Sequence, residues 1–281
     1  MLPNWSTKQW MLSHCLVLSI LLLILVQVFA VTNNKIKITV LDVGQGDAIL
    51  IQTPEYKNIL IDAGDVGKIN GPISSEMLFF RPVIDLFILT HPHRDHFAGF
   101  FDLIQKYEIK SIMITGVISH DPLYKEFIRL IKSRNIPITY PSNAEDIQIS
   151  HDLFLDILYP FTGQSLLGHE VRNKNNSSIV INLSDSFGSP LMILTGDAEE
   201  ELEREILLSG QTIKSPVLKL GHHGSKTATS DDFLSAVSPK TAIISAGFEN
   251  IFNHPHIETM EKINGLDIRN TMDDGSIQFN F

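Results

Sequence analysis

The feature that most constrains the fold of this chain is a histidine-rich stretch, THPHRDHFAG, at residues 90–99. It places three histidines and an aspartate within six positions. The apolar run just before it, 86–90, predicts a short buried strand, so the stretch stands at the carboxyl end of that strand. Neutral imidazole nitrogens and carboxylate oxygens are ligands suited to zinc, manganese or iron. The stretch therefore predicts a metal site; surface or helix-capping histidines are the alternative.

The spacing within this stretch divides the ligands between two positions. His91 and His93 are alternate residues of an extended segment, so their imidazoles can face one ion. Asp95 and His96 follow where the chain turns into a helix that we expect to begin near Phe97. These two side chains face a second position beside the first, so the stretch is expected to serve two divalent metal ions.

A fifth candidate ligand, Asp197, lies far along the chain. Together with Gly196 it follows an apolar strand expected at 191–195. A Gly-Asp pair before a helix can be no more than an amino-terminal cap. Because this strand end is equivalent to the one that carries the histidines, a carboxylate that bridges two metals is the better interpretation, and Gly196 would let the backbone approach closely.

Two further histidine groups also follow expected strands. His222 and His223 lie between glycines after the strand 215–220. Adjacent side chains diverge, so we expect one of them to bind an ion and the other to be an outer or acid–base partner. His254 or His256, in a later loop, could also reach the site, although an ordinary loop histidine explains them equally well.

The composition limits the kinds of metal site and partner. The chain has 281 residues and a single cysteine, Cys15, which excludes an internal disulfide and any cysteine-rich zinc site. Its 22 basic and 32 acidic residues give a formal net charge of −10. This acidity argues against a protein that coats nucleic acid passively. An enzyme that holds phosphate through bound cations is not excluded, because each divalent ion changes the sign of the local field.

An uncharged apolar run at 15–31 dominates the amino-terminal region. As a helix of 17 residues it would span about 25 Å, slightly less than a ~30 Å hydrocarbon core. Val28-Phe29-Ala30 resembles the small-x-small pattern of a signal-peptide cleavage site. Residues 1–34 are therefore predicted to be a signal peptide or a single transmembrane anchor with a short junction. We expect a membrane-anchored or secreted protein whose catalytic domain lies outside the cytoplasm.

Residues 35–281 are predicted to form one α/β domain, without internal repeats or long linkers. The expected strands are 36–43, 48–53, 58–62, 86–90, 111–115, 136–140, 146–150, 154–159, 178–183, 191–195, 215–220, 241–245 and 276–281. The expected helices are 97–107, 123–134, 198–208, 231–237 and 257–264. Two sheets with helices outside them is the simplest architecture for this alternation.

The segment 42–47, DVGQGD, contains a Gly-x-Gly but lacks a third glycine and a following helix, so it is not a dinucleotide fingerprint. We interpret it as a tight hairpin turn. Asp42, Gln45 or Asp47 could there support the metal ligands from outside the coordination shell.

Taken in order, these motifs resemble the metallo-β-lactamase superfamily, and most closely the metallo-β-lactamase-like domain of the ComEC competence proteins. The resemblance runs from about residue 36 to the end. The matching segments are 42–48 (DVGQGDA), 60–64 (LIDAG), 90–99 (THPHRDHFAG), 175–180 (NNSSIV), 194–199 (LTGDAE), 218–225 (LKLGHHGS), 245–247 with Asn250 (SAG..N), and 254–255 (HP).

The resemblance implies an αββα sandwich with a metal cluster at one edge. Its metal ligands, carried over residue by residue, are His91 and His93 for the first ion, Asp95 and His96 for the second, a bridging Asp197, and one of His222 and His223 to complete the second site, with His223 preferred. The metals expected are zinc or manganese.

One departure from the family concerns the first ion. Many of these hydrolases carry another histidine, in a Gly-His-Thr context, before the strand that leads to Gly-Asp. Here the residues before strand 178–183 are Lys-Asn-Asn-Ser, as in the ComEC-like group. The third ligand of the first metal is then Asn175, Asn176 or a histidine from 254–256. Such weaker coordination makes manganese as reasonable as zinc.

The resemblance implies a metal-dependent hydrolase. Two metals about 3.5–4 Å apart would share a water and lower its pKa toward ~7, which makes a bridging hydroxide available. Asp95 would orient the hydroxide, and His222 or His254 could protonate the leaving group. We expect hydrolysis of a phosphodiester in single-stranded DNA, with DNA-uptake machinery as a partner. The alternatives are hydrolysis of another ester (a phosphorylcholine-type phosphodiester, a lactone or a β-lactam) and a non-enzymatic, metal-stabilised module for DNA uptake.

Overall fold

The computed structural model describes residues 6–31, 35–141, 147–161 and 163–281. The chain divides into two compact units, Met1–Lys35 and Ile36–Phe281. The first contains helix α1 (Thr7–Val31), in which Thr7–Val26 is long and apolar enough to cross a membrane. A signal sequence near an amino terminus meets the same criterion. Both predicted roles of this segment therefore remain.

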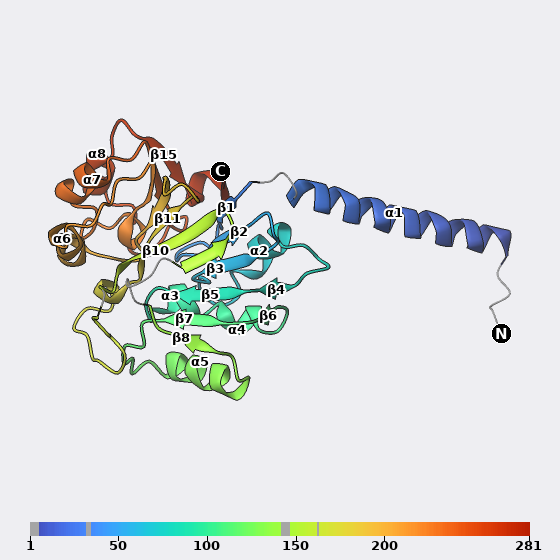
Figure 1. The fold of residues 1–281 in the computed structure, drawn as a ribbon, viewed down its shortest axis with the longest axis horizontal. Helices are drawn as coiled ribbons and strands as arrows, with labels where there is room; N and C mark the ends of the chain where they lie inside the picture. Colours follow the sequence, from blue (N-terminus) through green and yellow to red (C-terminus); the bar gives the residue numbers. More distant parts are fainter. Residues whose placement is uncertain (1–5, 32–34, 142–146, 162) are drawn as a thin grey trace. The chain divides into compact units, whose positions relative to one another are not determined.

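Two seven-stranded sheets make up the described framework of the second unit (Figure 1). The first sheet has the strand order β16 (Ile277–Asn280), β1 (Lys37–Val40), β2 (Ile49–Gln52), β3 (Asn58–Ile61), β5 (Leu86–Leu89), β7 (Ile112–Ile114) and β8 (Ile138–Thr139). The second has the order β15 (Asp267–Asn270), β14 (Thr241–Ile244), β13 (Val217–Lys219), β12 (Pro190–Leu194), β11 (Val180–Ser184), β10 (Leu153–Tyr159) and β9 (Ile147–Ser150). A short pair, β4 (Val83–Ile84) and β6 (Glu108–Ile109), is separate from both.

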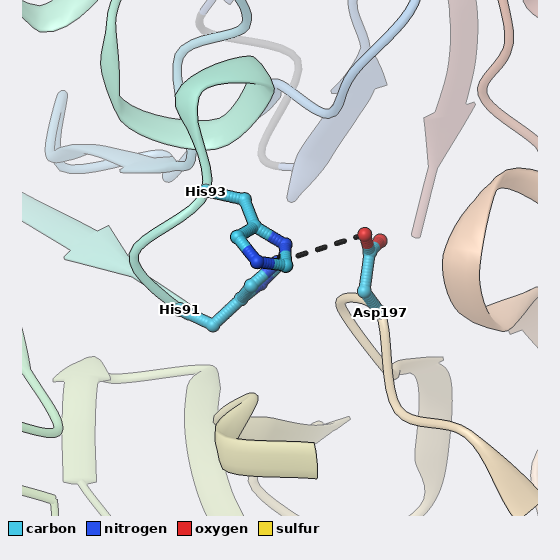
Figure 2. A group of neighbouring side chains, drawn as sticks. All are labelled: His91, His93 and Asp197. Atoms are coloured by element: carbon cyan, nitrogen blue, oxygen red, sulfur yellow. Dashed lines mark hydrogen bonds and ion pairs between the residues drawn. The ribbon is translucent and has the colours of Figure 1, made fainter. Parts of the chain in front are cut away.

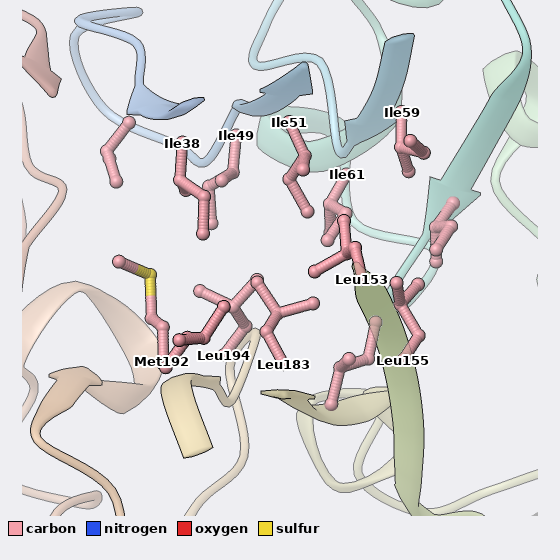
Figure 3. Close-up of a cluster of buried hydrophobic side chains, with 14 of the residues drawn as sticks. Ile38, Ile49, Ile51, Ile59, Ile61, Leu153, Leu155, Leu183, Met192 and Leu194 are labelled. Carbon is pink, nitrogen blue, oxygen red and sulfur yellow. The ribbon is translucent and has the colours of Figure 1, made fainter. Parts of the chain in front are cut away.

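The sheets pack face to face through aliphatic side chains (Figure 3). Ile49 and Ile51 of β2 lie in this inter-sheet core together with Leu183 and Leu194 of the second sheet. Leu50, between the two isoleucines, belongs instead to the cluster on the outer face. Successive side chains of a strand point to opposite faces, and here both faces are buried. That is why these strands are continuous apolar runs in the sequence.

Helices cover the outer face of each sheet. Over the first sheet, apolar residues of helices pack against the strands; these helices are α2 (Asn70–Glu76), α3 (Arg94–Phe97), α4 (Phe100–Leu103) and α5 (Pro122–Ser133). Over the second sheet the corresponding helices are α6 (Glu200–Leu208), α7 (Asp231–Val237) and α8 (Ile257–Lys262). One further short helix, α9 (Thr271–Asp274), follows β15. The predicted αββα sandwich is confirmed.

The helix predicted at 97–107 begins earlier and is broken. His93 is the residue before α3, so Asp95 and His96 lie in the first helical turn rather than ahead of it. The break falls at Gly99, where a Cβ atom would lie 2.1 Å from the carbonyl oxygen of Ala63. Only glycine permits that approach of two backbones. The histidine stretch is thus fixed against the loop that follows β3.

Other differences concern short or polar elements. Five short elements were not predicted from the sequence: α2, β4, β6, β15 and α9. The edge strand β15 has the sequence DIRN, which lacks the apolar alternation of a half-buried strand. The strand predicted at 136–140 is only Ile138–Thr139. The first residue of the strand predicted at 146–150 lies outside the described residues.

Candidate metal centre

Three loops at strand ends converge on one place. The loop after β5 carries His91 and His93, the loop after β12 carries Asp197, and a turn after β13 carries His223. Figure 2 shows the two histidines of the first loop facing the aspartate of the second. Because β5 and β12 belong to different sheets, the site lies between the two halves of the sandwich.

The first group of candidate ligands is His91, His93 and Asp197, whose ligand atoms all lie within 4.8 Å of one another. The Nε2 atom of His91 is 3.0 Å from Nδ1 of His93 and 3.6 Å from Oδ2 of Asp197. On its other side, Nδ1 of His91 meets the hydroxyls of Thr90 and Ser178 at 3.1 and 3.3 Å. These hydroxyls hold the ring with Nε2 directed at the centre.

The second group is Asp95, His96 and His223, which meets the same distance criterion. The Nε2 atom of His223 lies 3.3 Å from Oδ2 of Asp95. Oδ2 of Asp197 is 3.2 Å from Nε2 of His96 and 3.5 Å from Nε2 of His223. Asp197 therefore contacts histidines of both groups, as a carboxylate between two ions would.

Two hydrogen bonds orient the buried imidazoles of the second group. Nδ1 of His96 lies 2.7 Å from Oδ2 of Asp62, and that oxygen also accepts a hydrogen bond from the hydroxyl of Thr90 at 2.7 Å. The other oxygen of Asp62, Oδ1, accepts from the amide of Thr90 at 2.8 Å. Nδ1 of His223 donates to the carbonyl oxygen of Ser245 at 2.9 Å. With Nδ1 engaged in this way, each Nε2 is directed into the centre, which is the usual arrangement of metal-binding histidines.

A buried ion pair lies behind His223. Lys219 and Asp47 are both buried and in contact, and Lys219 also donates to the carbonyl oxygen of Gly196 at 3.1 Å. Oδ1 of Asp47 lies 3.3 Å from Nδ1 of His223. Asp47 is one of the supports predicted from the sequence, whereas no role was predicted for Lys219. The available signal was a lysine within the otherwise apolar run VLKL.

The electrostatics of the cluster favour positive charge at its centre. Burial alone would raise the pKa of Asp197, but the imidazoles of His223 and His96 hold it well below its usual range. Burial opposes a charged imidazole, yet the carboxylates of Asp197 and Asp47 raise the pKa of His223 to about 9. Carboxylates that keep their charge when buried are also those suited to a divalent cation.

The two candidate acid–base histidines lie to one side of the cluster. Nδ1 of His222 is 3.1 Å from Oε1 of Glu199, and its ring centroid is 5.3 Å from that of His254. His254 faces Gln45, with 3.5 Å between Nδ1 and the side-chain nitrogen. Burial and the charge of His222 lower the pKa of His254 to about 4. His254 is therefore neutral at pH 7 and a poorer proton donor than the sequence suggested.

The residues proposed as a third ligand of the first ion differ in the hydrogen bonds that their side chains already make. The amide of Asn176 accepts a hydrogen bond from the backbone of Glu199 and donates to Glu201, so both its polar atoms are occupied. Asn175 donates to Glu199 at 3.0 Å, and its Oδ1 is buried without a hydrogen-bond partner in the described chain. His256 accepts from the amide of Lys226 at 3.1 Å. Of the two asparagines, Asn175 is the one whose side-chain oxygen has no hydrogen-bond partner in the described chain.

A pocket of about 360 Å³ opens beside the cluster. Its lining includes ligand candidates, two basic side chains and one aromatic ring: Gln45, Pro92, His93, Arg94, Asp95, Asp121, Lys174, Asp197, His222, His223, Phe252 and His254. Nε of Arg94 donates to Asp121 at 3.0 Å, so its charge is paired. Lys174 contacts the hydroxyl of Ser119 at 3.2 Å and has no ion pair within the described residues.

Comparison with known proteins agrees with this geometry. The sequence profile of the Metallo-beta-lactamase superfamily matches residues 41–247. The chain is 29% identical over 273 residues to ComE operon protein 3 of Bacillus subtilis, covering 90% of this chain and 34% of that protein. It is 31% identical over 254 residues to Recombination protein 2 of Haemophilus influenzae, covering 87% of this chain and 29% of that protein. The chain thus spans about a third of the length of the curated relatives it matches.

Among solved structures, the metallo-beta-lactamase fold protein YhfI of Bacillus subtilis superposes with a TM-score of 0.55 at 10% sequence identity. The match covers 89% of this chain and all of that one. At this identity the likeness concerns the fold alone.

Proposed function

Since this chain belongs to the metallo-beta-lactamase superfamily, we propose that it is a metal-dependent phosphodiesterase that cleaves single-stranded DNA. The proposal has three supports: a donor set that fits divalent ions, a pocket that fits an anionic ester, and similarity to competence proteins.

The donor set fits two divalent ions, zinc or manganese. Three buried atoms of the cluster lack a hydrogen-bond partner in the described chain: Oδ1 of Asp197, Nε2 of His96 and Nε2 of His223. Such orphaned polar atoms are costly unless something else binds them. His91, His93 and Asp197 would hold one ion, and Asp95, His96 and His223 the other, with Asp197 shared. Bound divalent ions would supply a water of lowered pKa and neutralise charge that develops on phosphoryl oxygens.

The observation that carries the choice of substrate is Lys174. It lines the pocket next to His93, is only partly exposed, and has no carboxylate partner among the described residues. A cation in this position is suited to an anion that occupies the pocket, and lysine binds phosphate as a point charge. A phosphodiester in single-stranded DNA presents such an anion. The chain as a whole is acidic, with a formal net charge of −10, so an unpaired lysine in this pocket stands out.

The remaining pocket residues divide the proton-handling roles. Asp95 lines the pocket, and we assign it the role of orienting the attacking water. His222, held by Glu199, is the better candidate to protonate the leaving oxygen, because His254 is neutral at pH 7. His254 then orients His222 or substrate.

The cellular setting belongs to the same proposal. Helix α1 is apolar enough to anchor the protein in a membrane or to direct its export. The relatives of this chain include a protein named Competence protein ComA, from Neisseria gonorrhoeae. We therefore place the catalytic domain outside the cytoplasm, in association with DNA-uptake machinery.

The test uses the full chain, purified in detergent, with an end-labelled single-stranded oligonucleotide. Reactions with Mn²⁺, Zn²⁺, Mg²⁺ or a chelator should show cleavage with at least one metal and none with the chelator. His93→Ala should abolish cleavage, whereas His151→Ala, an exposed histidine outside the pocket, should not. If the protein hydrolyses a phosphorylcholine ester, a lactone or a cephalosporin but does not cleave the oligonucleotide, its substrate is that ester and not DNA. Metal binding without any turnover would instead indicate a non-enzymatic module.

A further inference from the structure

An exposed apolar loop stands beside the charged pocket. We call residues 247–254 the aromatic loop. Three of its large apolar side chains are exposed, Phe248 by 75%, Ile251 by 87% and Phe252 by 52%. Such a cluster at the mouth of a site often marks a binding surface.

The aromatic loop is held in one shape by Asn250. The side-chain nitrogen of Asn250 donates to the carbonyl oxygens of Gly247 and His254 at 2.9 and 2.6 Å. Its oxygen accepts from the amide of His254 at 2.9 Å. A single side chain thus closes the loop from both ends.

Gly247 docks the aromatic loop onto the turn between β1 and β2. A Cβ atom at this position would lie 2.7 Å from the backbone nitrogen of Gln45, so no larger residue fits. The amide of Gly247 also donates to the side-chain oxygen of Gln45 at 3.3 Å. The exposed rings are therefore presented by a preorganised backbone, which reduces the entropy lost on binding.

Of the exposed apolar side chains on the loop, Phe252 is the one that lines the pocket. Its ring stacks on that of His254, with centroids 5.7 Å apart and planes inclined by 24°. The same pocket is lined by Lys174 and by the ligand candidates His93 and Asp197. One pocket thus combines an anion-binding lysine, the proposed metal centre and a half-exposed aromatic ring.

We propose that Phe252 is a stacking platform for a nucleobase of single-stranded DNA next to the phosphate that is cleaved. This inference rests on the proposed function and specifies its substrate. A single strand alternates anionic phosphates with flat bases, so a phosphate held at Lys174 and the metal centre leaves a neighbouring base to meet the ring. Stacking accepts every base, because each has a π-face. In a duplex the bases are already stacked on one another, so the platform favours single strands.

The first experiment compares Phe252→Ala with the unaltered full chain in oligonucleotide cleavage. Stacking on an aromatic side chain contributes about 1–3 kcal/mol per base, so KM should rise about 5- to 150-fold. Because the base does not change during the reaction, kcat should change little. Phe252→Trp keeps a stacking surface and should retain a KM near that of the unaltered chain.

Phe248→Ala is the matched control. Phe248 is a more exposed phenylalanine of the same loop, and it does not line the pocket. Its replacement should leave KM unchanged. Equal losses in Phe248→Ala and Phe252→Ala would assign the effect to general apolarity of the loop and overturn the inference.

The second experiment varies the substrate. An abasic nucleotide is moved through the oligonucleotide, one position at a time. With the unaltered chain, one position beside the cleaved bond should raise KM as much as Phe252→Ala does. With Phe252→Ala, the same abasic oligonucleotide should raise KM no further, because the ring and the base contribute through one interaction. Changing both partners in this way is a double-mutant cycle, which isolates that interaction.

The outcomes separate the two proposals. If the unaltered chain cleaves oligonucleotides but Phe252→Ala and the abasic series leave KM unchanged, the stacking inference is wrong and the proposed function stands. If the unaltered chain cleaves no oligonucleotide with any divalent ion, both are wrong. An equal thermal shift on metal addition in Phe252→Ala and in the unaltered chain would show that the variant folds and keeps its metal site.

Discussion

Lys219 of β13 and Asp47 of the turn between β1 and β2 form a buried ion pair that joins the two sheets behind the metal centre. Asp47 faces His223 as well, so the pair fixes one side of a candidate ligand. Removing one partner of a buried pair leaves the other charge uncompensated. The pair therefore links the stability of the sandwich to the position of His223.

Lys219→Met should destabilise the protein by about 3–5 kcal/mol, because it removes the lysine that is paired with the buried carboxylate of Asp47. Urea unfolding in the presence of a chelator measures this loss without a contribution from metal. The double variant Lys219→Met with Asp47→Leu removes both charges and should recover most of the stability. A single variant as stable as the unaltered chain would contradict the ion-pair interpretation.

Asp62→Ala should weaken metal binding about 10- to 100-fold, because outer hydrogen bonds orient metal-binding histidines. In this chain the affected ring is His96, whose Nδ1 is 2.7 Å from the Asp62 carboxylate. Competition with a chromogenic chelator gives the affinity directly. Asp65→Ala, an exposed aspartate three residues further along, is the matched control and should bind metal normally.

Lys174→Ala should raise KM for a single-stranded oligonucleotide and reduce the salt dependence of binding. Each phosphate contact contributes a slope of about −0.7 in a plot of log affinity against log salt for single strands. Lys174→Arg keeps the charge and should retain most of that slope. Lys240→Ala removes an exposed lysine outside the pocket and should have no effect. An unchanged slope in Lys174→Ala would remove the support for a phosphate at this residue.

The carboxylate of Asp85 should make stability depend on acid pH. Burial opposes its ionisation, but the amide of Asn58 and the guanidinium of Arg81 hold the pKa of Asp85 below its usual value. A lowered folded-state pKa contributes stability above the unfolded value, about 3.9, that is lost as pH falls through the folded pKa. Urea unfolding of Asp85→Asn should therefore differ most from the unaltered chain near pH 6 and converge with it in acid. A constant difference would contradict this linkage.

Much of the sandwich could be predicted because its strands are buried on both faces. Continuous apolar runs such as 86–90 and 191–195 stand out from the rest of the sequence, and the ligands that follow them stand out too. That is why residues distant in sequence, His91 and Asp197, could be expected to meet. The two residues follow strands of different sheets, β5 and β12, and the equivalent ends of these strands meet at the candidate metal centre.

What could not be predicted depends on contacts between distant segments. Nothing local shows that Lys219 is buried against Asp47, or that Gly99 breaks a helix because Ala63 approaches it. The third ligand of the first ion could not be predicted either, because this sequence has asparagines where many related hydrolases carry a histidine. The sequence left Asn175 and Asn176 equivalent, and only their hydrogen bonds to the start of α6 distinguish them.

The location of the ligands between the two sheets has a consequence for the order of assembly. His91, His93, Asp95 and His96 follow a strand of the first sheet, whereas Asp197 and His223 follow strands of the second. Neither half of the sandwich carries a complete ligand group without the other. Metal capture therefore reports that the halves have docked, and a chain still folding has no hydrolytic centre.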